Sequence, residues 1–212
     1  MNGAVTDFVG DPLWNRPASS YTLAAMADAA AQAAVVPLTA AIAAAAGGAD
    51  HLHLPPPETL HVSLYSMAPA RRAFDKEAYW RLAAQDTYTV LRDWCATQPP
   101  FDLHFTSLRA MPEAVIAVAA PAEPVWTLRR RCAERLPPPP GGAPRYDLIH
   151  MTLARYARPQ ALPGDFAARI GAIAVDMPFA LQRVLLMREK IYPSLSFDSL
   201  DTMALGAPEV TA

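Results

Sequence analysis

The sequence lacks the signature motifs of several large enzyme classes. It has no Walker loop, no GxGxxG, no GxSxG and no CxxC pair, so no pattern points to a phosphate-binding P-loop, a dinucleotide fold, a serine-hydrolase elbow or a paired-cysteine metal site. Cysteine is scarce as well. The two cysteines, Cys95 and Cys132, match no metal-binding spacing, and two cysteines in 212 residues do not predict a disulfide framework.

Charged side chains are also few. The chain is 18% charged and 52% apolar, a balance that predicts a folded globular protein and not a disordered one. Its formal net charge of -2 argues against broad, sequence-independent binding to nucleic acid. The cations are nearly all arginine, a residue suited to planar recognition of phosphate. We therefore expect no extended nucleic-acid surface, while a local pocket for a small phosphate is compatible with the composition.

No uninterrupted apolar run is long enough to suggest a membrane span. The alanine-rich segment 23–46 contains Asp28, Gln32 and Pro37, and alanine is only weakly hydrophobic, so it does not fit a spanning helix. No positively charged N-terminus leads into an apolar core with a cleavage site, so we see no signal peptide. We expect a cytoplasmic monomer that makes no membrane contact.

The length suits one domain or two closely packed lobes. Residues 1–20, rich in Pro, Asn, Asp and Ser, predict an irregular N-terminal lead-in, and residues 21–212 a single bilobed domain. Along that domain the pattern alternates between helices and groups of strands, as if one strand–helix unit were used twice. This order predicts an α+β fold.

Individual elements follow from periodicity and breakers. Residues 21–27 fit either a strand or the start of the following helix. Pro37 fits the first turn of a helix that ends at Gly47 and Gly48. Residues 73–98 predict an amphipathic helix, either continuous or broken near Thr87. The remaining expectations are strands at 51–54, 60–67, 101–108, 114–120 and 146–156, one or two strands at 178–191, and helices at 125–136 and 161–173.

Histidine followed two positions later by a hydroxyl residue is over-represented. Of the five histidines, three show this pattern: His61-Val62-Ser63, His104-Phe105-Thr106 and His150-Met151-Thr152. Chance predicts such a match at about one histidine in ten. A single instance is usually just the polar face of a strand, but two in equivalent strands of a duplicated layout favour a site.

Strand geometry explains why chemistry would use this spacing. Residues i and i+2 share one face of a strand, about 6.5 to 7 Å apart. His61 and Ser63 then point one way, and His150 and Thr152 do so on their own strand. Two such strands side by side would present two imidazoles and two hydroxyls to one phosphodiester. One imidazole would accept a proton from the attacking oxygen and the other would donate one to the leaving oxygen, a scheme that requires no metal or cofactor.

The third match, at His104, serves as an internal control. Ser107 stands where the other two motifs have leucine, and His104 lies about halfway between the other two histidines. We interpret it as a surface residue of its strand, with a place in the pocket as the alternative.

The two remaining motifs resemble those of a known family. LHVSL at 60–64 and IHMTLAR at 149–155, whose histidines are 89 positions apart, are similar to the paired motifs of the two-histidine phosphoesterase superfamily. The closest resemblance is to its bacterial branch, the 2'-5' RNA ligase or RNA 2',3'-cyclic phosphodiesterase family, and it extends from about Tyr21 to the end. Arg155 matches an arginine that commonly follows the second motif in that family.

The resemblance implies a bilobed, pseudo-duplicated α+β fold, with two antiparallel sheets facing a central cleft and helices outside. It implies that His61 and His150 form the acid–base pair and that Ser63 and Thr152 hold phosphate. The implied activities are opening 2',3'-cyclic phosphates, cleaving 2'-5' linkages and trimming RNA ends without metal. The expected substrate is a small phosphodiester, a cyclic nucleotide or an RNA end.

Three further residues are candidates for the pocket. Tyr65 continues the face of His61 and Ser63, and Tyr156 continues that of His150, so each could line the pocket or pack in the core. Arg155 alternates away from that face in an ideal strand and reaches phosphate only if the strand twists or ends there.

Other interpretations stay open. The protein could be a nucleotide- or RNA-end-binding module that keeps the fold without turnover. A zinc hydrolase using His51, His53 and His61 is the weaker alternative, since no nearby cysteine or carboxylate completes a site. The arginines at 129–131 and Arg135 could touch phosphates, but we interpret them as a solvated helix face.

Overall fold

The computed structural model describes residues 7–206. Four α-helices occur in this range: α1 (Ala29–Ala45), α2 (Lys76–Thr97), α3 (Glu123–Arg135) and α4 (Phe166–Gly171). The strands are β1 (Pro17–Met26), β2 (Leu52–His53), β3 (His61–Ala68), β4 (Phe101–Ala110), β5 (Ala114–Ala119), β6 (Ile149–Tyr156), β7 (Met177–Leu181), β8 (Arg183–Ile191) and β9 (Ser196–Ala204).

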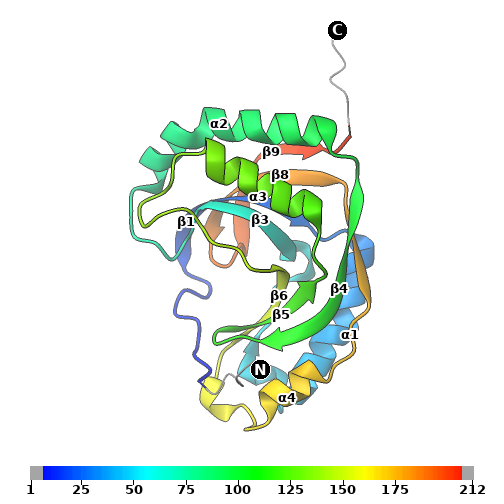
Figure 1. The fold of residues 1–212 in the computed structure, drawn as a ribbon. Coiled ribbons are helices and arrows are strands. Elements are labelled where there is room, and N and C mark those ends of the chain that lie inside the picture. Colours follow the sequence, from blue (N-terminus) through cyan, green and yellow to red (C-terminus); the bar gives the residue numbers. More distant parts are fainter. Residues whose placement is uncertain (1–6, 207–212) are drawn as a thin grey trace.

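The strands form one curled antiparallel sheet in the order β7-β4-β5-β6-β3-β1-β8-β9, and β2 adds to β6 (Figure 1). Its two halves meet where β3 pairs with β6, through the residue pair Val62 and Met151. The two expected sheets are therefore the two halves of a continuous one. The α+β class, the antiparallel strands and the helices outside are confirmed.

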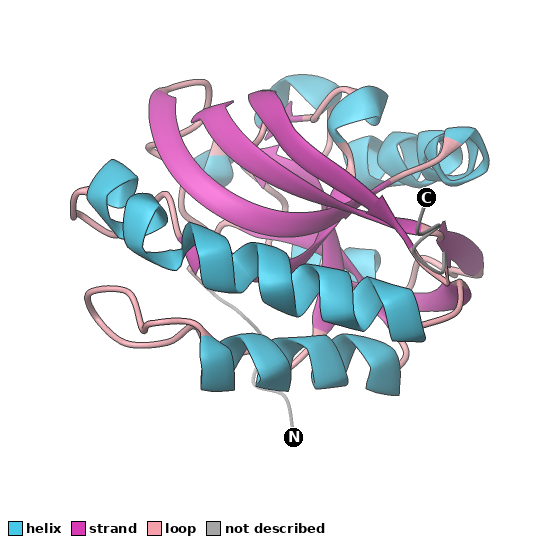
Figure 2. Cartoon of the chain, turned by 90° about the horizontal axis from the view of Figure 1, so that it is seen from above, coloured by secondary structure: helices cyan, strands magenta, loops and turns pink. Residues whose placement is uncertain are grey.

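The chain repeats one unit. The series β1-α1-β3-α2-β4 is followed by β5-α3-β6-α4 and then the strands β7 and β8, and the sheet order is symmetric about the β3–β6 junction. Each half is covered by two helices (Figures 1 and 2): α2 and α3 pack on the half that contains β3, and α1 and α4 on the half that contains β6. Helix α3 follows β5 in sequence and yet packs against β3 in the other half.

Alternating apolar residues give the sheet its core face. Val62 and Leu64 on β3, and Met151 and Leu153 on β6, are completely buried, as the strand pattern predicts. The histidines and hydroxyl residues between them belong to the other face. The pairing of two buried strands thus leaves a polar face at the centre of the molecule.

The observed boundaries differ from the expected ones at the N-terminal end. Strand β1 begins at Pro17, so the last residues of the 1–20 lead-in belong to the sheet. Helix α1 begins at Ala29, because the Asp28 side chain accepts a hydrogen bond from the Ala31 N–H and caps it. Pro37 consequently lies inside the helix and not in its first turn.

Strand β9 (Ser196–Ala204) was not expected. It is an edge strand paired only to β8, and its side chains are mostly exposed or half-buried, so it carries little apolar alternation. Both cysteines are buried and unpaired. Within residues 7–206, no helix combines the length and the apolar character needed to cross a membrane.

Candidate active site

The two histidine motifs meet at the junction of β3 and β6. An antiparallel register through Val62 and Met151 places His61 opposite Thr152 and Ser63 opposite His150. Directly opposite side chains in such a ladder are roughly 5 Å apart at Cβ, and diagonal ones roughly 7 Å. All four side chains line one cavity of about 230 Å³. The structure therefore brings together the four residues that the sequence singled out.

A matching irregularity in the two strands decides which later residues face this cavity. On β3, Ser63 pairs with Ala24 and Tyr65 with Leu23, so Leu64 has no partner across the ladder. On β6, Thr152 and Ala154 have successive partners on β5, so Leu153 has none. An extra residue of this kind is a β-bulge, and it reverses the alternation beyond it. The residue five positions after each histidine then faces the cavity.

The bulges bring Ser66 and Arg155 to the cavity wall. They also decide between the two alternatives left open for Tyr65 and Tyr156. Tyr65 and Tyr156 do not line the cavity: Tyr65 is turned to the core side, where it packs against Tyr146. Tyr156 is fully buried, and its hydroxyl donates to the carbonyl oxygens of Met111 and Ala114.

His61 is oriented by the backbone. Its Nδ1 lies 2.8 Å from the carbonyl oxygen of Thr59, and because a carbonyl only accepts, Nδ1 carries the proton. In the neutral ring Nε2 is then the basic nitrogen. Burial lowers the pKa of His61, the Thr59 carbonyl opposes that change, and the positive charge of Arg155 adds to it.

His150 is held neutral as well. Burial, together with the nearby Arg129, His61 and Arg155, lowers the pKa of His150 to about 4, and Asp147 acts in the opposite direction. An imidazole with this pKa is a free base at neutral pH. A bound phosphate would supply the missing negative charge and favour the protonated form of either ring.

The low pKa of His150 predicts that the folded state loses stability as pH falls from 6.5 to about 4. In that window the unfolded chain binds a proton at His150 that the folded protein does not, so acid favours unfolding. The stability contributed by the neutral ring is fully present above pH 6.5, the ordinary pKa of histidine. We expect the free energy of unfolding of His150→Gln, measured by urea denaturation across this window, to depend less on pH than that of the wild type. Equal pH dependence in the two proteins would contradict the assignment.

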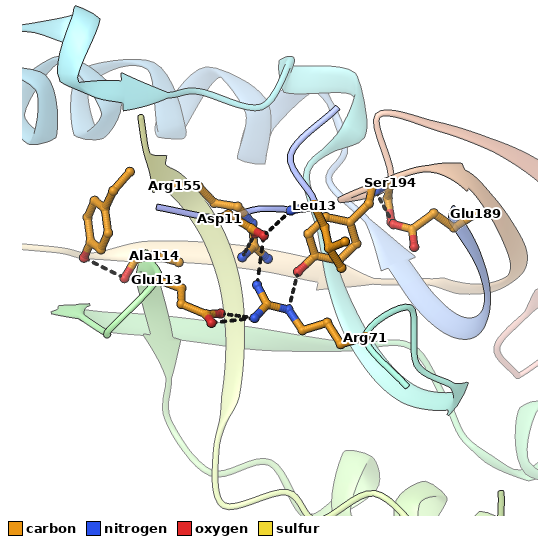
Figure 3. A network of polar contacts seen from close by, with 10 residues as sticks. Asp11, Leu13, Arg71, Glu113, Ala114, Arg155, Glu189 and Ser194 are labelled. Atoms are coloured by element: carbon orange, nitrogen blue, oxygen red, sulfur yellow. Dashed lines mark hydrogen bonds and ion pairs between the residues drawn. The ribbon is translucent and has the colours of Figure 1, made fainter. Parts of the chain in front are cut away.

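Arg155 belongs to a charged network beside the cavity (Figure 3). Its Nη1 lies 2.6 Å from Asp11 Oδ2, and Arg71 Nη2 lies 3.1 Å from Asp11 Oδ1. Arg71 also pairs with Glu113, and its Nε donates to the Tyr192 hydroxyl at 3.2 Å. The Nε of Arg155 is buried without a hydrogen-bond partner among residues 7–206. The network therefore leaves one buried guanidinium donor of this cavity-lining residue without a partner.

Sequence reasoning missed both Asp11 and Arg71. Asp11 lies in the segment expected to be an irregular lead-in, and Arg71 follows β3 in a turn. No periodic pattern marks either residue, since both are brought to the site by loops. Two acids and two arginines nearly balance, so the site is far less basic than its arginine content suggests.

A buried carboxyl also lines the cavity. Glu189 accepts hydrogen bonds from the hydroxyls of Ser20 at 2.9 Å and Ser194 at 3.0 Å. It is only 4% exposed, and burial raises its pKa. Figure 3 shows it bonded to Ser194, on the far side of the drawn network from Glu113. Its oxygens are occupied by these neighbours, which indicates a role in bracing the 192–195 turn.

The other histidines lie elsewhere. His104 is half-exposed on β4 and pairs with Asp176 at 2.9 Å, so the surface interpretation is confirmed. His51 Nδ1 contacts the Ala46 carbonyl at 2.8 Å, and His53 stacks on Trp14 at 4.7 Å. Among residues 7–206, no three metal-ligating side chains are close enough together to hold an ion.

The arginine group on α3 is not simply a solvated face. Arg130 and Arg135 are exposed, but Arg129 is buried and bonds to backbone carbonyls. The expectation was wrong for this residue, because its position on the helix faces β3 and the carbonyls of Ser63 and Leu64 accept its N–H groups.

The family comparison agrees with this geometry. The profile of the 2'-5' RNA ligase superfamily matches residues 30–190, a span that contains both motifs. The chain belongs to the 2'-5' RNA ligase superfamily. The resemblance to the two-histidine phosphoesterases is thereby confirmed. No curated protein sequence matches the chain.

Solved structures place this superfamily member among similar folds. The protein TT0787 of Thermus thermophilus is 18% identical with a TM-score of 0.63, over 89% of this chain and 98% of that one. A crystal structure titled phosphoesterase is 13% identical with a TM-score of 0.59, over 89% and 99%. E. coli LigT complexed with 3'-AMP is 13% identical with a TM-score of 0.58, over 90% and 99%. At these identities the likeness establishes the fold.

Proposed function

We propose that the protein is a phosphoesterase that opens 2',3'-cyclic phosphates or related phosphodiesters at the end of a nucleotide or RNA. The observation that carries the proposal is the convergence of His61, Ser63, His150 and Thr152 on one cavity. The similar E. coli LigT has been crystallised with 3'-AMP and with phosphate, which supports a nucleotide phosphate as the ligand. The small cavity suits a single terminal group better than an extended strand.

Hydrolysis on this array is an acid–base reaction. One imidazole removes a proton from water as the water oxygen bonds to phosphorus. The bond from phosphorus to a ribose oxygen breaks, and the second imidazole donates a proton to that oxygen. The product is a phosphate monoester with a free ribose hydroxyl. The two rings end the cycle with exchanged protonation states, which solvent restores.

The surroundings of the two rings favour a division of labour. Burial and three neighbouring groups, Arg129 among them, hold His150 neutral, so we assign it as the base. His61 has a backbone carbonyl on Nδ1, which stabilises its imidazolium, so we assign it as the acid. The negatively charged phosphate is what raises the proton affinity of His61 when substrate is bound.

Three further groups would bind the phosphate. The hydroxyls of Ser63 and Thr152 can donate to its non-bridging oxygens. Arg155 lines the cavity, and its charge would stabilise the negative charge that develops in the transition state. The Leu153 bulge is what turns this arginine towards the cavity.

A binding module without turnover is the alternative function. It would need the arginine and the hydroxyls but has no use for two imidazoles placed diagonally across the phosphate site. The presence of both rings in one cavity favours the enzyme.

The test is turnover of a substrate panel. It comprises the four 2',3'-cyclic nucleotides, a 2'-5' dinucleotide and an RNA with a cyclic end, each assayed with and without EDTA and resolved by chromatography. We expect hydrolysis of at least one cyclic substrate at an unchanged rate in EDTA, because protons and not a metal carry the reaction. Loss of activity with chelator would refute the metal-free scheme. Ligand binding without any product would favour the binding module.

A further inference from the structure

Arg129 is a buried cation without a carboxylate partner. It is 5% exposed on α3, and none of the ion pairs within residues 7–206 includes it. Its guanidinium lies against the rings of Tyr146 at 4.1 Å and Trp126 at 4.7 Å. Burial lowers its pKa to about 10, so it is charged at neutral pH. Buried cations are normally paired, which calls for an account of this one.

The hydrogen bonds of Arg129 reach both motif strands. Nε donates to the Leu64 carbonyl at 2.9 Å and Nη2 to the Ser63 carbonyl at 3.2 Å, both on β3. Nη1 donates to the carbonyl of Leu148 at 3.0 Å, two residues before His150. One planar, rigid group is thus bonded to the backbone beside both sets of proposed catalytic side chains.

The carbonyls that Arg129 binds on β3 belong to the bulge. Leu64 has no partner in the ladder, so the bulge disturbs the pairing of its backbone groups. On the same side, the Tyr146 hydroxyl accepts the Ser66 N–H, and the Tyr146 ring lies against Arg129. Arg129 and Tyr146 together hold the carbonyl and amide groups on either side of the bulged residue.

We propose that Arg129 is a positioning residue: it fixes the Leu64 bulge against the start of β6, so that His61, Ser63 and His150 converge on one phosphate. The inference rests on the proposed function. The residue reaches β3 from α3 and is not among those that line the cavity, so it would not touch substrate. Its effect passes through the backbone, because β3 and β6 share only one ladder pair and need a second tie to hold their relative placement.

The charge of Arg129 has an electrical effect as well. The charged and titratable groups that face His150 are Arg129 from α3, His61 from β3, Arg155 from β6 and Asp147 from the preceding loop. The three cationic or titratable neighbours disfavour its protonation, and Asp147 favours it. Removing the Arg129 charge should make the ring easier to protonate, whereas lysine would keep the charge but lose the three-way geometry.

The experiment compares Arg129→Lys and Arg129→Met with Arg130→Met, a control on the exposed neighbour. In Arg129→Lys we expect kcat for a cyclic substrate to fall about tenfold or more, with KM changed far less, since small displacements of catalytic groups slow the reaction steeply. In Arg129→Met we expect the acid limb of kcat/KM to move to higher pH as well. Arg130→Met should resemble the wild type.

Two readouts keep the test decisive when turnover is lost or a variant folds poorly. NMR titration of His150 gives its pKa without any substrate. The affinity for inorganic phosphate shows whether His61, Ser63 and His150 still converge on one phosphate. Arg129→Lys and Tyr146→Phe are the milder changes. Both variants should bind phosphate several-fold more weakly while their NMR spectra remain those of folded proteins. Folded Arg129 variants with wild-type kcat, phosphate affinity and His150 pKa would overturn the proposal. A wild type that binds phosphate but shows no turnover would refute the proposed function alone.

Discussion

Replacing His61 or His150 with alanine is expected to reduce turnover of a 2',3'-cyclic substrate by about a thousandfold or more. Each ring transfers one proton in the transition state, and a positioned acid or base contributes roughly a hundred- to ten-thousandfold. The two act on the same step, so the double variant should be little worse than either single one. Initial rates for the four purified proteins, with circular dichroism to verify folding, measure this.

His104→Ala is the matched control for that experiment. His104 belongs to the same kind of motif but lies half-exposed on β4 against Asp176. The variant should therefore keep nearly all activity. Ser63→Ala and Thr152→Ala should show intermediate losses, because each removes one hydrogen bond to phosphate and leaves both rings. A dead His104→Ala variant with an active His61→Ala variant would show that the pairing of motifs is wrong.

Arg155→Met is expected to lower the free energy of unfolding by about 3 kcal/mol. The Asp11 side chain is 0% exposed and the Arg155 side chain 12%, so losing the arginine leaves a buried carboxylate whose remaining ionic partner is Arg71. That partner is more exposed, at 38%, and is shared with Glu113. Urea denaturation followed by tryptophan fluorescence measures the effect.

The double variant Asp11→Asn with Arg155→Met tests the cause. Neutralising the acid removes the uncompensated buried charge, so the pair of changes should cost much less than the sum of the two single ones. Arg158→Met, which breaks an exposed ion pair with Asp50, should have little effect. Additive costs in the double variant would mean that Arg155 stabilises the fold by packing and not by its charge.

Local patterns in the sequence were enough to find the two motif strands. His61-Val62-Ser63 and His150-Met151-Thr152 could be placed on strands, with their polar residues on one face, because side chains alternate strictly over three residues. The facing of residues beyond this short range could not be predicted. Beyond each motif an unpaired leucine reverses the alternation, so Tyr65 and Tyr156 turn to the core and Arg155 turns to the cavity.

The remaining parts of the site depended on the tertiary structure. Asp11 and Arg71 arrive from loops, and a loop has no period from which the direction of a side chain can be inferred. The sequence of α3 likewise did not distinguish Arg129 from its exposed neighbours, because which side of a helix is buried depends on what packs against it. Alternation is a property of one strand and can be read from a single chain segment. Bulges, ion pairs and buried arginines are set by partners far away in the sequence, and only the folded chain brings those partners together.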